Sequence, residues 1–214
     1  MVALHRALPV LVAIAGLSGT VAAAEVSAAE MPANGIFLVA KRDLRDPNFK
    51  ETVVLVTHPQ RGGPYGVIIN RPLGQPLSEV FPEHETLKGR KDVLFFGGPV
   101  AREGLVFLVR APKPPPRAVP VLQDVYFTSD PDWIDGLLKR PEPTRGLRVF
   151  AGYSGWAPGQ LQSEIARGGW YVLPADAETV FEMESSRIWP ELIGRATTRH
   201  TRAAPAAAGA AARF

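Results

Sequence analysis

The sequence contains no cysteine, and this absence removes several kinds of site at once. Without thiols there is no disulfide, no cysteine zinc site and no thiolate nucleophile. Histidine is scarce as well, with four in 214 residues and none in a His-x-His or His-Glu-x-x-His spacing. We therefore expect no metal site and no cofactor, and we expect His58 and His84 to be solvated loop residues.

Long apolar runs are also missing. The longest, at residues 7–17, is shorter than the about 20 residues that a membrane-spanning helix needs. With Arg6 before it and Ala22-Ala23-Ala24 after it, the run predicts a signal peptide over residues 1–24 and a linker over 25–34. We expect a periplasmic protein with no membrane span after cleavage, or a cytoplasmic one if translation starts at Met31. The first residue of the native protein distinguishes the two.

The folded part lacks a basic surplus, although the sequence pI is about 9.4. All 21 acids lie between residues 25 and 194, where 19 of the 24 lysines and arginines also lie, which gives a net charge of −2. Residues 196–214 hold nine alanines and no capped apolar stripe, which predicts a disordered Ala/Arg tail. Nucleic-acid domains carry their basic surplus on the folded surface, so we expect no DNA partner if the protein is exported.

Short β-branched and apolar runs predict strands, first in a series and then between helices. The predicted strands are 35–40, 52–57, 66–69, 93–96, 105–110, 125–128, 147–151 and 170–173. Asp130-Pro131 predicts a helix start, Pro158 another, and 111–120, with five prolines, a stiff connector. We predict a single α+β domain over residues 35–195. Its sheet is mixed and largely antiparallel, and its three to four helices lie mostly in the second half.

Three segments are rich in the residue types that hold ligands. They are Asn70-Arg71-Pro72 after a strand, Gly97-Gly98-Pro99 in a tight turn, and 152–161 between a strand and a helix start. Glycines allow a ligand to approach the backbone, and an arginine can hold a carboxylate or phosphate with two hydrogen bonds. The candidate ligand-binding residues are Asn70, Arg71, Gly97, Gly98, Pro99, Tyr153, Trp156 and Gln160. Turn formation, an ion pair at Arg71 and core packing are the structural alternatives.

Taken together, five motifs in order resemble the YqgE/AlgH proteins. They are GIFLVA at 35–40, DPNF at 46–49 with TVVL at 52–55, GVIINRP at 66–72, GGPV at 97–100, and GYSGWAPGQLQSEI at 152–165. The resemblance covers residues 35–195 and implies a strongly curved sheet that forms a pseudo-barrel. It implies no activity, since members are described as uncharacterised and some are labelled putative transcriptional regulators. Members are typically cytoplasmic and begin near the position of Met31.

Three functions follow as hypotheses. The first is a non-enzymatic binding or regulatory domain for an unknown small anionic ligand or a protein partner. The second is an enzyme of unrecognised type that acts on an anionic small molecule at the same surface, with its catalytic residues unknown. The third is a transcriptional regulator, for which no helix-turn-helix signal is present. Gly152-Tyr153-Ser154-Gly155-Trp156 departs from the Gly-x-Ser-x-Gly elbow at its fifth residue, which argues against a serine hydrolase.

Overall fold

The computed structural model describes residues 34–58 and 63–203. The predicted signal peptide at 1–24, the linker up to residue 33 and the tail from residue 204 lie outside this part. The strands are β1 (Ile36–Ala40), β2 (Val53–Thr57), β3 (Tyr65–Ile68), β4 (Pro72–Pro76), β5 (Val93–Phe96), β6 (Val100–Arg110), β7 (Val119–Leu122), β8 (Val125–Thr128), β9 (Leu147–Gly155) and β10 (Trp170–Pro174). The helices are α1 (Leu77–Val80), the 3-10 turn η2 (Glu85–Leu87), α2 (Pro131–Leu138), α3 (Gln160–Ala166), α4 (Ala177–Phe181) and α5 (Ser185–Ala203).

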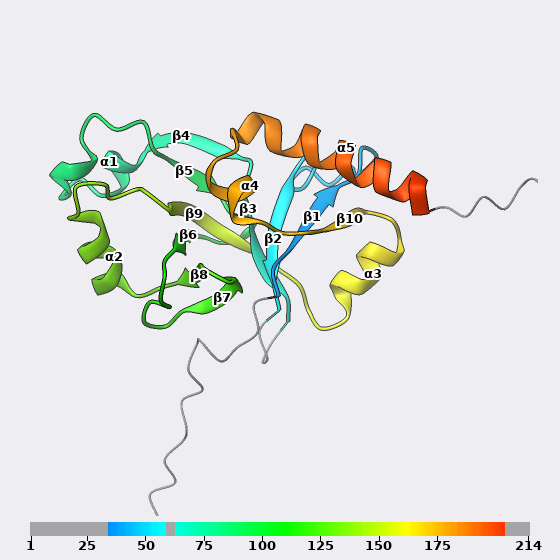
Figure 1. Cartoon of the computed structure of the whole chain (residues 1–214), viewed down its shortest axis with the longest axis horizontal. Helices are drawn as coiled ribbons and strands as arrows, with labels where there is room; N and C mark the ends of the chain where they lie inside the picture. Colours follow the sequence, from blue (N-terminus) through cyan, green and yellow to red (C-terminus); the bar gives the residue numbers. More distant parts are fainter. Residues whose placement is uncertain (1–33, 59–62, 204–214) are drawn as a thin grey trace, which may run out of the picture.

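The sheet is a curled half-barrel, as predicted for a largely antiparallel α+β fold. Its order is β10-β1-β2-β3-β9-β6-β8-β7, and β5 joins β9 in parallel while pairing with β4. The curl brings β7 back to the first strands, where Gly35 N donates to Val121 O at 2.8 Å and Thr57 Oγ1 donates to Pro120 O at 3.1 Å. Strand β9 runs through the middle of the molecule and pairs with β3, β5 and β6 (Figure 1).

Two strands were not expected, and both lie at edges. Strand β4 starts and ends with proline and is almost wholly exposed, while β7 falls at the end of the predicted proline connector. A proline cannot donate to a neighbouring strand, so the sequence favours turns there. An edge strand tolerates the missing donor, and Pro120 still supplies its carbonyl to Thr57. The structure also has five α-helices in its described part, rather than the three to four expected.

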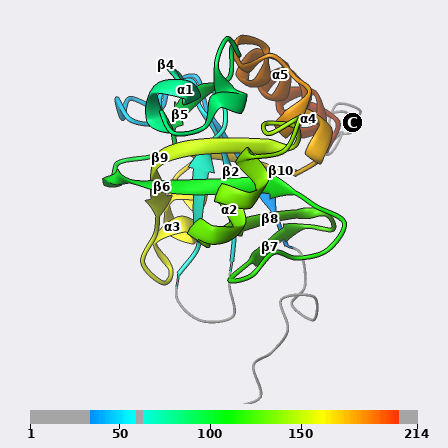
Figure 2. The same ribbon diagram turned by 90° about the vertical axis from the view of Figure 1, so that its left-hand side faces the viewer.

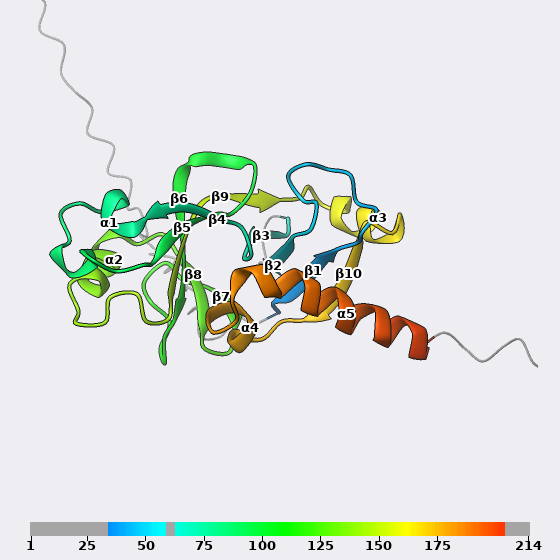
Figure 3. The ribbon, with the colours of Figure 1, turned by 90° about the horizontal axis from the view of Figure 1, so that it is seen from above.

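The first core lies between the curled sheet and α5. Helix α5 crosses β1 and β10 (Figure 3), and its buried residues Ile188, Leu192 and Ala196 recur every four positions as an apolar stripe. Because Ala196 continues that stripe and α5 runs to Ala203, the predicted start of a disordered tail at residue 196 is wrong for residues 196–203. Trp189 fixes the helix on the sheet through a 2.8 Å hydrogen bond from Nε1 to Ala40 O.

The second core lies under α2, on the other face of β6, β8 and β9 (Figure 2). The predicted start of this helix is confirmed, since Asp130 accepts a 2.9 Å hydrogen bond from Trp133 N and Pro131 is the first helical residue. Side chains alternate along β6, so that Phe107 and Val109 enter this core while Leu108 enters the first. Helix α5 thus covers one face of the sheet at β1 and β10, and α2 covers the opposite face at β6, β8 and β9.

The closure of the curl can be tested at Gly35. A Cβ there would lie 2.6 Å from Val121 O, so we expect Gly35→Ala to lower the free energy of unfolding by about 1–3 kcal/mol. Gly136 in α2 is the matched control, since an added Cβ meets nothing within 4 Å. Gly136→Ala should raise stability by about 0.5–1 kcal/mol. Urea unfolding measures both, and a Gly35→Ala protein as stable as the parent would contradict a tight closure.

Candidate functional site

Asn70 holds the loop before β2. Its Oδ1 accepts from Val53 N at 2.8 Å, and its Nδ2 donates to Glu51 O at 3.0 Å. Glu51 has a left-handed backbone with φ of 56°, which is uncommon for a residue with a side chain. The amide of Asn70 therefore fixes a left-handed loop end, and this uses one of its two N–H donors and one of its two acceptor sites.

Arg71 binds the same loop. Its guanidinium donates to Asn48 O at 2.7 Å and to Lys50 O at 3.1 Å, and it lies over the ring of Phe96 at 5.8 Å. Partial burial lowers the pKa of Arg71 from its ordinary value. The structural alternative at Arg71 was an ion pair that pins the loop after β3. The hydrogen bonds instead pin residues 46–51, before β2.

The glycines at 97 and 98 mark a crossing of two backbones. Gly97 N donates to Ala151 O at 2.9 Å, and Gly97 O accepts from Ile68 N and from Ser154 Oγ. A Cβ at Gly97 would lie 2.2 Å from Gly152 O, and one at Gly98 would lie 2.4 Å from Tyr153 O. The turn thus needs glycine for close packing on β9, and Pro99 follows it on the surface.

Trp156 and Gln160 meet at one carboxylate. Glu164 accepts from Trp156 Nε1 at 3.0 Å, from Trp170 Nε1 at 3.1 Å and from Gln160 Nε2 at 3.0 Å. Gln160 Oε1 also accepts from Ala157 N, so its side chain closes the turn before α3. Helix α3 starts at Gln160 rather than at Pro158, because Gly159 in the left-handed region precedes it.

Phe49 joins these contacts into one assembly. Its ring lies 6.4 Å from that of Trp156 in a stacked arrangement and 5.5 Å from that of Trp170 edge-on. The loop at 46–51 is therefore held by Asn70 and Arg71 on one side and by the two tryptophans on the other. Motifs that are distant in sequence converge on this loop, and most of their polar groups are engaged within the chain.

Two of the candidate residues, Tyr153 and Trp156, line a cavity of about 690 Å³, which we call the aromatic cavity. Its lining includes Tyr65, Val106, Arg117, Phe127, Tyr153 and Trp156. Asn70, Arg71, Gly97, Gly98, Pro99 and Gln160 are not among the residues that line it. The structure thus divides the predicted set into two that face this cavity and six that do not.

The position of Tyr153 depends on a break in strand alternation. Phe150 and Tyr153 both contact the first core although they are three residues apart, so one extra residue is inserted between them. The register with β6 shifts at the same place, and in that ladder the unpaired residues lie in β6, between Val100 and Leu105, opposite Ala151 and Tyr153. Gly152, with φ of 67°, is the residue that takes up the left-handed backbone of this bulge. The bulge directs Tyr153 toward the aromatic cavity.

Tyr65 is a half-buried residue of the lining that sequence reasoning missed. Its ring lies 5.4 Å from that of Phe127 and 6.4 Å, edge-on, from that of Tyr153. Burial raises the pKa of Tyr65 to about 12, so its hydroxyl is a neutral donor across the physiological range. Tyr65 lay just before the predicted strand 66–69, Phe127 was marked only as a strand residue of 125–128, and Arg117 lay within the predicted proline connector.

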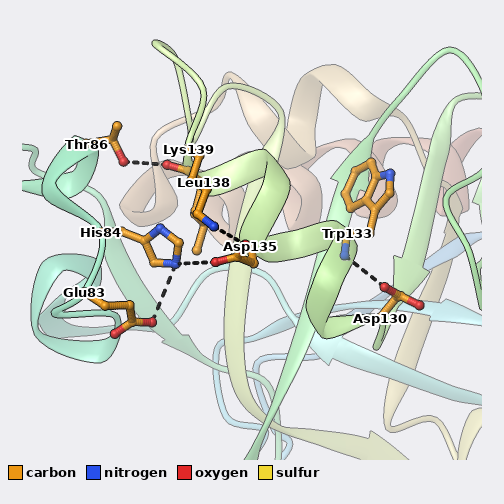
Figure 4. A network of polar contacts seen from close by, with 8 residues as sticks. All are labelled: Glu83, His84, Thr86, Asp130, Trp133, Asp135, Leu138 and Lys139. Carbon is orange, nitrogen blue, oxygen red and sulfur yellow. Dashed lines mark hydrogen bonds and ion pairs between the residues drawn. The ribbon is translucent and has the colours of Figure 1, made fainter.

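The expectation that His84 is solvated is wrong. His84 is 6% exposed, and its Nε2 lies 3.5 Å from both Glu83 Oε1 and Asp135 Oδ1 (Figure 4). Thr86 Oγ1 donates to Leu138 O beside it, so this network ties residues 83–87 to α2. Among residues 34–58 and 63–203, no three histidine, aspartate or glutamate side chains are grouped to hold a metal ion. No helix in these ranges has the length and apolar character to cross a bilayer.

The fold and the cavity define an α+β half-barrel protein, and comparison with known proteins places it in a family. The AlgH-like family model matches residues 37–201, and the chain belongs to that family. A UPF0301 protein of Mycobacterium avium is 34% identical over 176 residues, which are 78% of this chain and 85% of the relative. A UPF0301 protein of Mycobacterium tuberculosis is 32% identical over 176 residues, or 78% and 84% of the two chains.

Solved structures share the fold. The crystal structure of protein DIP2367 from Corynebacterium diphtheriae has a TM-score of 0.61 at 27% identity, over 77% of this chain and 87% of that one. The solution structure of the AlgH protein from Pseudomonas aeruginosa has a TM-score of 0.60 at 22% identity, over 86% and 97% of the chains. The predicted family is thus confirmed, and its function is unknown.

We expect Arg71→Ala to destabilise the protein by about 1.5–3 kcal/mol, because two charge-assisted hydrogen bonds to the 46–51 loop are lost. Arg102 is a matched control, since it lies over the same Phe96 ring at 5.6 Å but is exposed. Arg102→Ala should change stability by less than about 0.5 kcal/mol. Thermal unfolding measures the melting temperatures of both variants. Equal melting temperatures would show that the hydrogen bonds of Arg71 contribute nothing to stability.

The raised pKa of Tyr65 predicts a pH dependence. The folded value of about 12 exceeds the unfolded value of about 10, so the stability from the buried neutral phenol is complete below pH 10 and is lost as the pH approaches 12. Between about pH 9 and pH 11 the parent should lose about 1 kcal/mol more stability than Tyr65→Phe. Urea unfolding at the two pH values measures this, and parallel losses would refute the assignment.

Proposed function

We propose that this protein is a non-enzymatic binding domain whose aromatic cavity takes a small molecule with a flat apolar body and one acidic group. The observation that carries this proposal is the cavity itself. Its volume of about 690 Å³ lies within the range of about 300–1,000 Å³ for small-molecule sites. Rings from β3, β8 and β9 line it, and Trp156 closes it from the segment before α3.

The polar groups of the cavity favour an acidic ligand. Arg117 lies in its lining with a side chain that is 71% exposed, and its Nε is 3.8 Å from Asp130 Oδ2, which is a loose ion pair. Neither hydroxyl of Tyr65 or Tyr153 has a hydrogen-bond partner among the described residues. Two phenol donors and one guanidinium can together bind a carboxylate while the rings contact the body of the molecule.

The same lining supports binding rather than catalysis. No described residue in it is an aspartate, glutamate, histidine or lysine, so it offers no side chain for general base catalysis near neutral pH. Ser154, which follows Tyr153, is fully buried and donates to Gly97 O at 3.1 Å, so it does not face the cavity as a nucleophile. An enzyme at this site would need a catalytic group from its substrate or from a partner.

Binding of aromatic carboxylates tests the proposal. Indole-3-acetate and phenylacetate are titrated into the purified protein beside their neutral amides, with calorimetry and Trp fluorescence as readouts. We expect the acids to bind at least about fivefold more tightly than the amides, which is about 1 kcal/mol. Arg117→Gln should abolish this preference, and Tyr153→Ala should weaken acid and amide alike.

Arg140→Gln is the control, because it removes one exposed positive charge outside the cavity. It should leave both affinities unchanged. Equal binding of acids and amides, or equal effects of the two arginine substitutions, would contradict an acid-selective site. Conversion of a bound acid to a new product, followed by mass spectrometry, would favour the enzyme hypothesis instead.

A further inference from the structure

A second site lies at the other end of β9, where Arg148 is held without a partner. Arg148 is half-buried, and its guanidinium lies over the Phe95 ring at 4.7 Å. It forms no hydrogen bond or ion pair with any residue of the described chain. Arginine is almost never fully buried unless it is paired, and a half-buried arginine with an aromatic ring but no ion pair has donors left for a ligand.

The strand pattern shows why Arg148 is unusual. Leu147 and Val149 enter the second core, so Arg148 and Phe150 face the first core on the opposite side of β9. An apolar residue would satisfy that position, as Phe150 does two residues later. Burial lowers the pKa of Arg148, and the nearby Glu182 and Asp92 carboxylates offset part of this effect. The charge remains and is poorly solvated in the free protein.

A cavity of about 430 Å³ opens beside this guanidinium. Three further cations and two acids line it, namely Arg90, Lys91, Arg145, Asp92 and Glu182. The cations outnumber the acids, and after the ion pairs are counted Lys91 and Arg148 remain beside one acid, Glu182. Arg90 pairs with Asp92 at 3.1 Å, and Arg145 pairs with Glu142 outside the lining at 2.9 Å. Lys91 has no ion pair with a described residue, so it and Arg148 are both free to bind an anion.

We propose that this cavity, the arginine pocket, binds the phosphate group of a small phosphorylated molecule. Arg148 offers a planar pair of donors that fits two oxygens of a phosphate, and Lys91 supplies a second positive charge. Two unpaired cations favour a doubly charged phosphate over a singly charged carboxylate, and Glu182 in the lining opposes part of this preference. The volume leaves room for a body beside Phe95 and Phe181. The arginine pocket and the aromatic cavity share no lining residue, so the two proposals stand independently.

Titration with inorganic phosphate tests the proposal, with glycerol 3-phosphate as a probe that has a body. Binding is measured on the full protein by calorimetry and by NMR shifts of backbone amides at 144–149, against chloride at equal ionic strength. We expect phosphate to shift these amides in a saturable way and chloride not to. We expect Arg148→Met to weaken phosphate at least tenfold while keeping the stem on Phe95 and leaving the melting temperature equal or higher.

Two further variants make the result decisive. Glu182→Gln removes an exposed acid from the lining and should tighten phosphate severalfold, and Arg140→Gln removes a distant surface charge and should change nothing. Equal shifts with phosphate and chloride would overturn the proposal. So would a fall in melting temperature in Arg148→Met together with unchanged affinity in Glu182→Gln, because Arg148 would then be structural only.

Discussion

The fold depends on the place where the turn at residues 97 and 98 crosses β9. There the two backbones approach so closely that neither Gly97 nor Gly98 has room for a Cβ. The crossing is locked by hydrogen bonds from Gly97 N to Ala151 O and from Ser154 Oγ to Gly97 O. Because β5 leads into this turn and β6 leaves it, the crossing sets the parallel pairing of β5 and the antiparallel pairing of β6 with the same strand. The rest of the sheet is arranged around β9.

The bulge at Gly152 gives β9 two ends with different surroundings. Before the bulge, Arg148 and Phe150 lie on the side of β9 that faces the first core. Arg148 lines the arginine pocket, which lies at the margin of that core. After it, the alternation is displaced by one residue, and Tyr153 reaches the aromatic cavity. One left-handed glycine is therefore the point at which the alternation of side chains along β9 changes. A residue with a Cβ at 152 would also lie 2.7 Å from Gly98 O, so the bulge and the crossing are one constraint.

Much of the fold could be predicted from the sequence, because local chemistry agreed with the final structure in most elements. Asp130 and Pro131 mark the start of α2, and the apolar runs mark eight of the strands. The failures have physical causes. Strand β7 was not predicted because it contains Pro120. An edge strand tolerates a proline, since the missing backbone N–H would have no neighbouring strand to bond there. The charged neighbours of His84 suggested solvent, whereas the fold turns that histidine onto α2 and buries it.

The candidate site was predictable only in part. A motif rich in glycine, asparagine and arginine signals an unusual backbone, but it does not reveal whether the backbone serves a ligand or the fold. Asn70 and Arg71 serve the loop at 46–51, and only three-dimensional contacts show this. Tyr65, Arg117 and Arg148 carry no local signal, because their significance lies in the contacts that the fold gives them: the rings beside Tyr65, the loose ion pair of Arg117 and the Phe95 ring under Arg148. Pairing of this kind is a property of tertiary structure, which single-sequence patterns do not encode.

Trp156 connects the aromatic cavity to the motif residues that do not line it. Trp156 lines the cavity, its ring is stacked with that of Phe49, and its Nε1 donates to Glu164. A ligand that contacts Trp156 therefore rests on a side chain whose position depends on the 46–51 loop, and so on Asn70 and Arg71. These residues act as positioning groups for a cavity that they do not touch. For the proposed ligand their contribution would be rigidity, because an indole that is already fixed loses no side-chain freedom when the ligand binds.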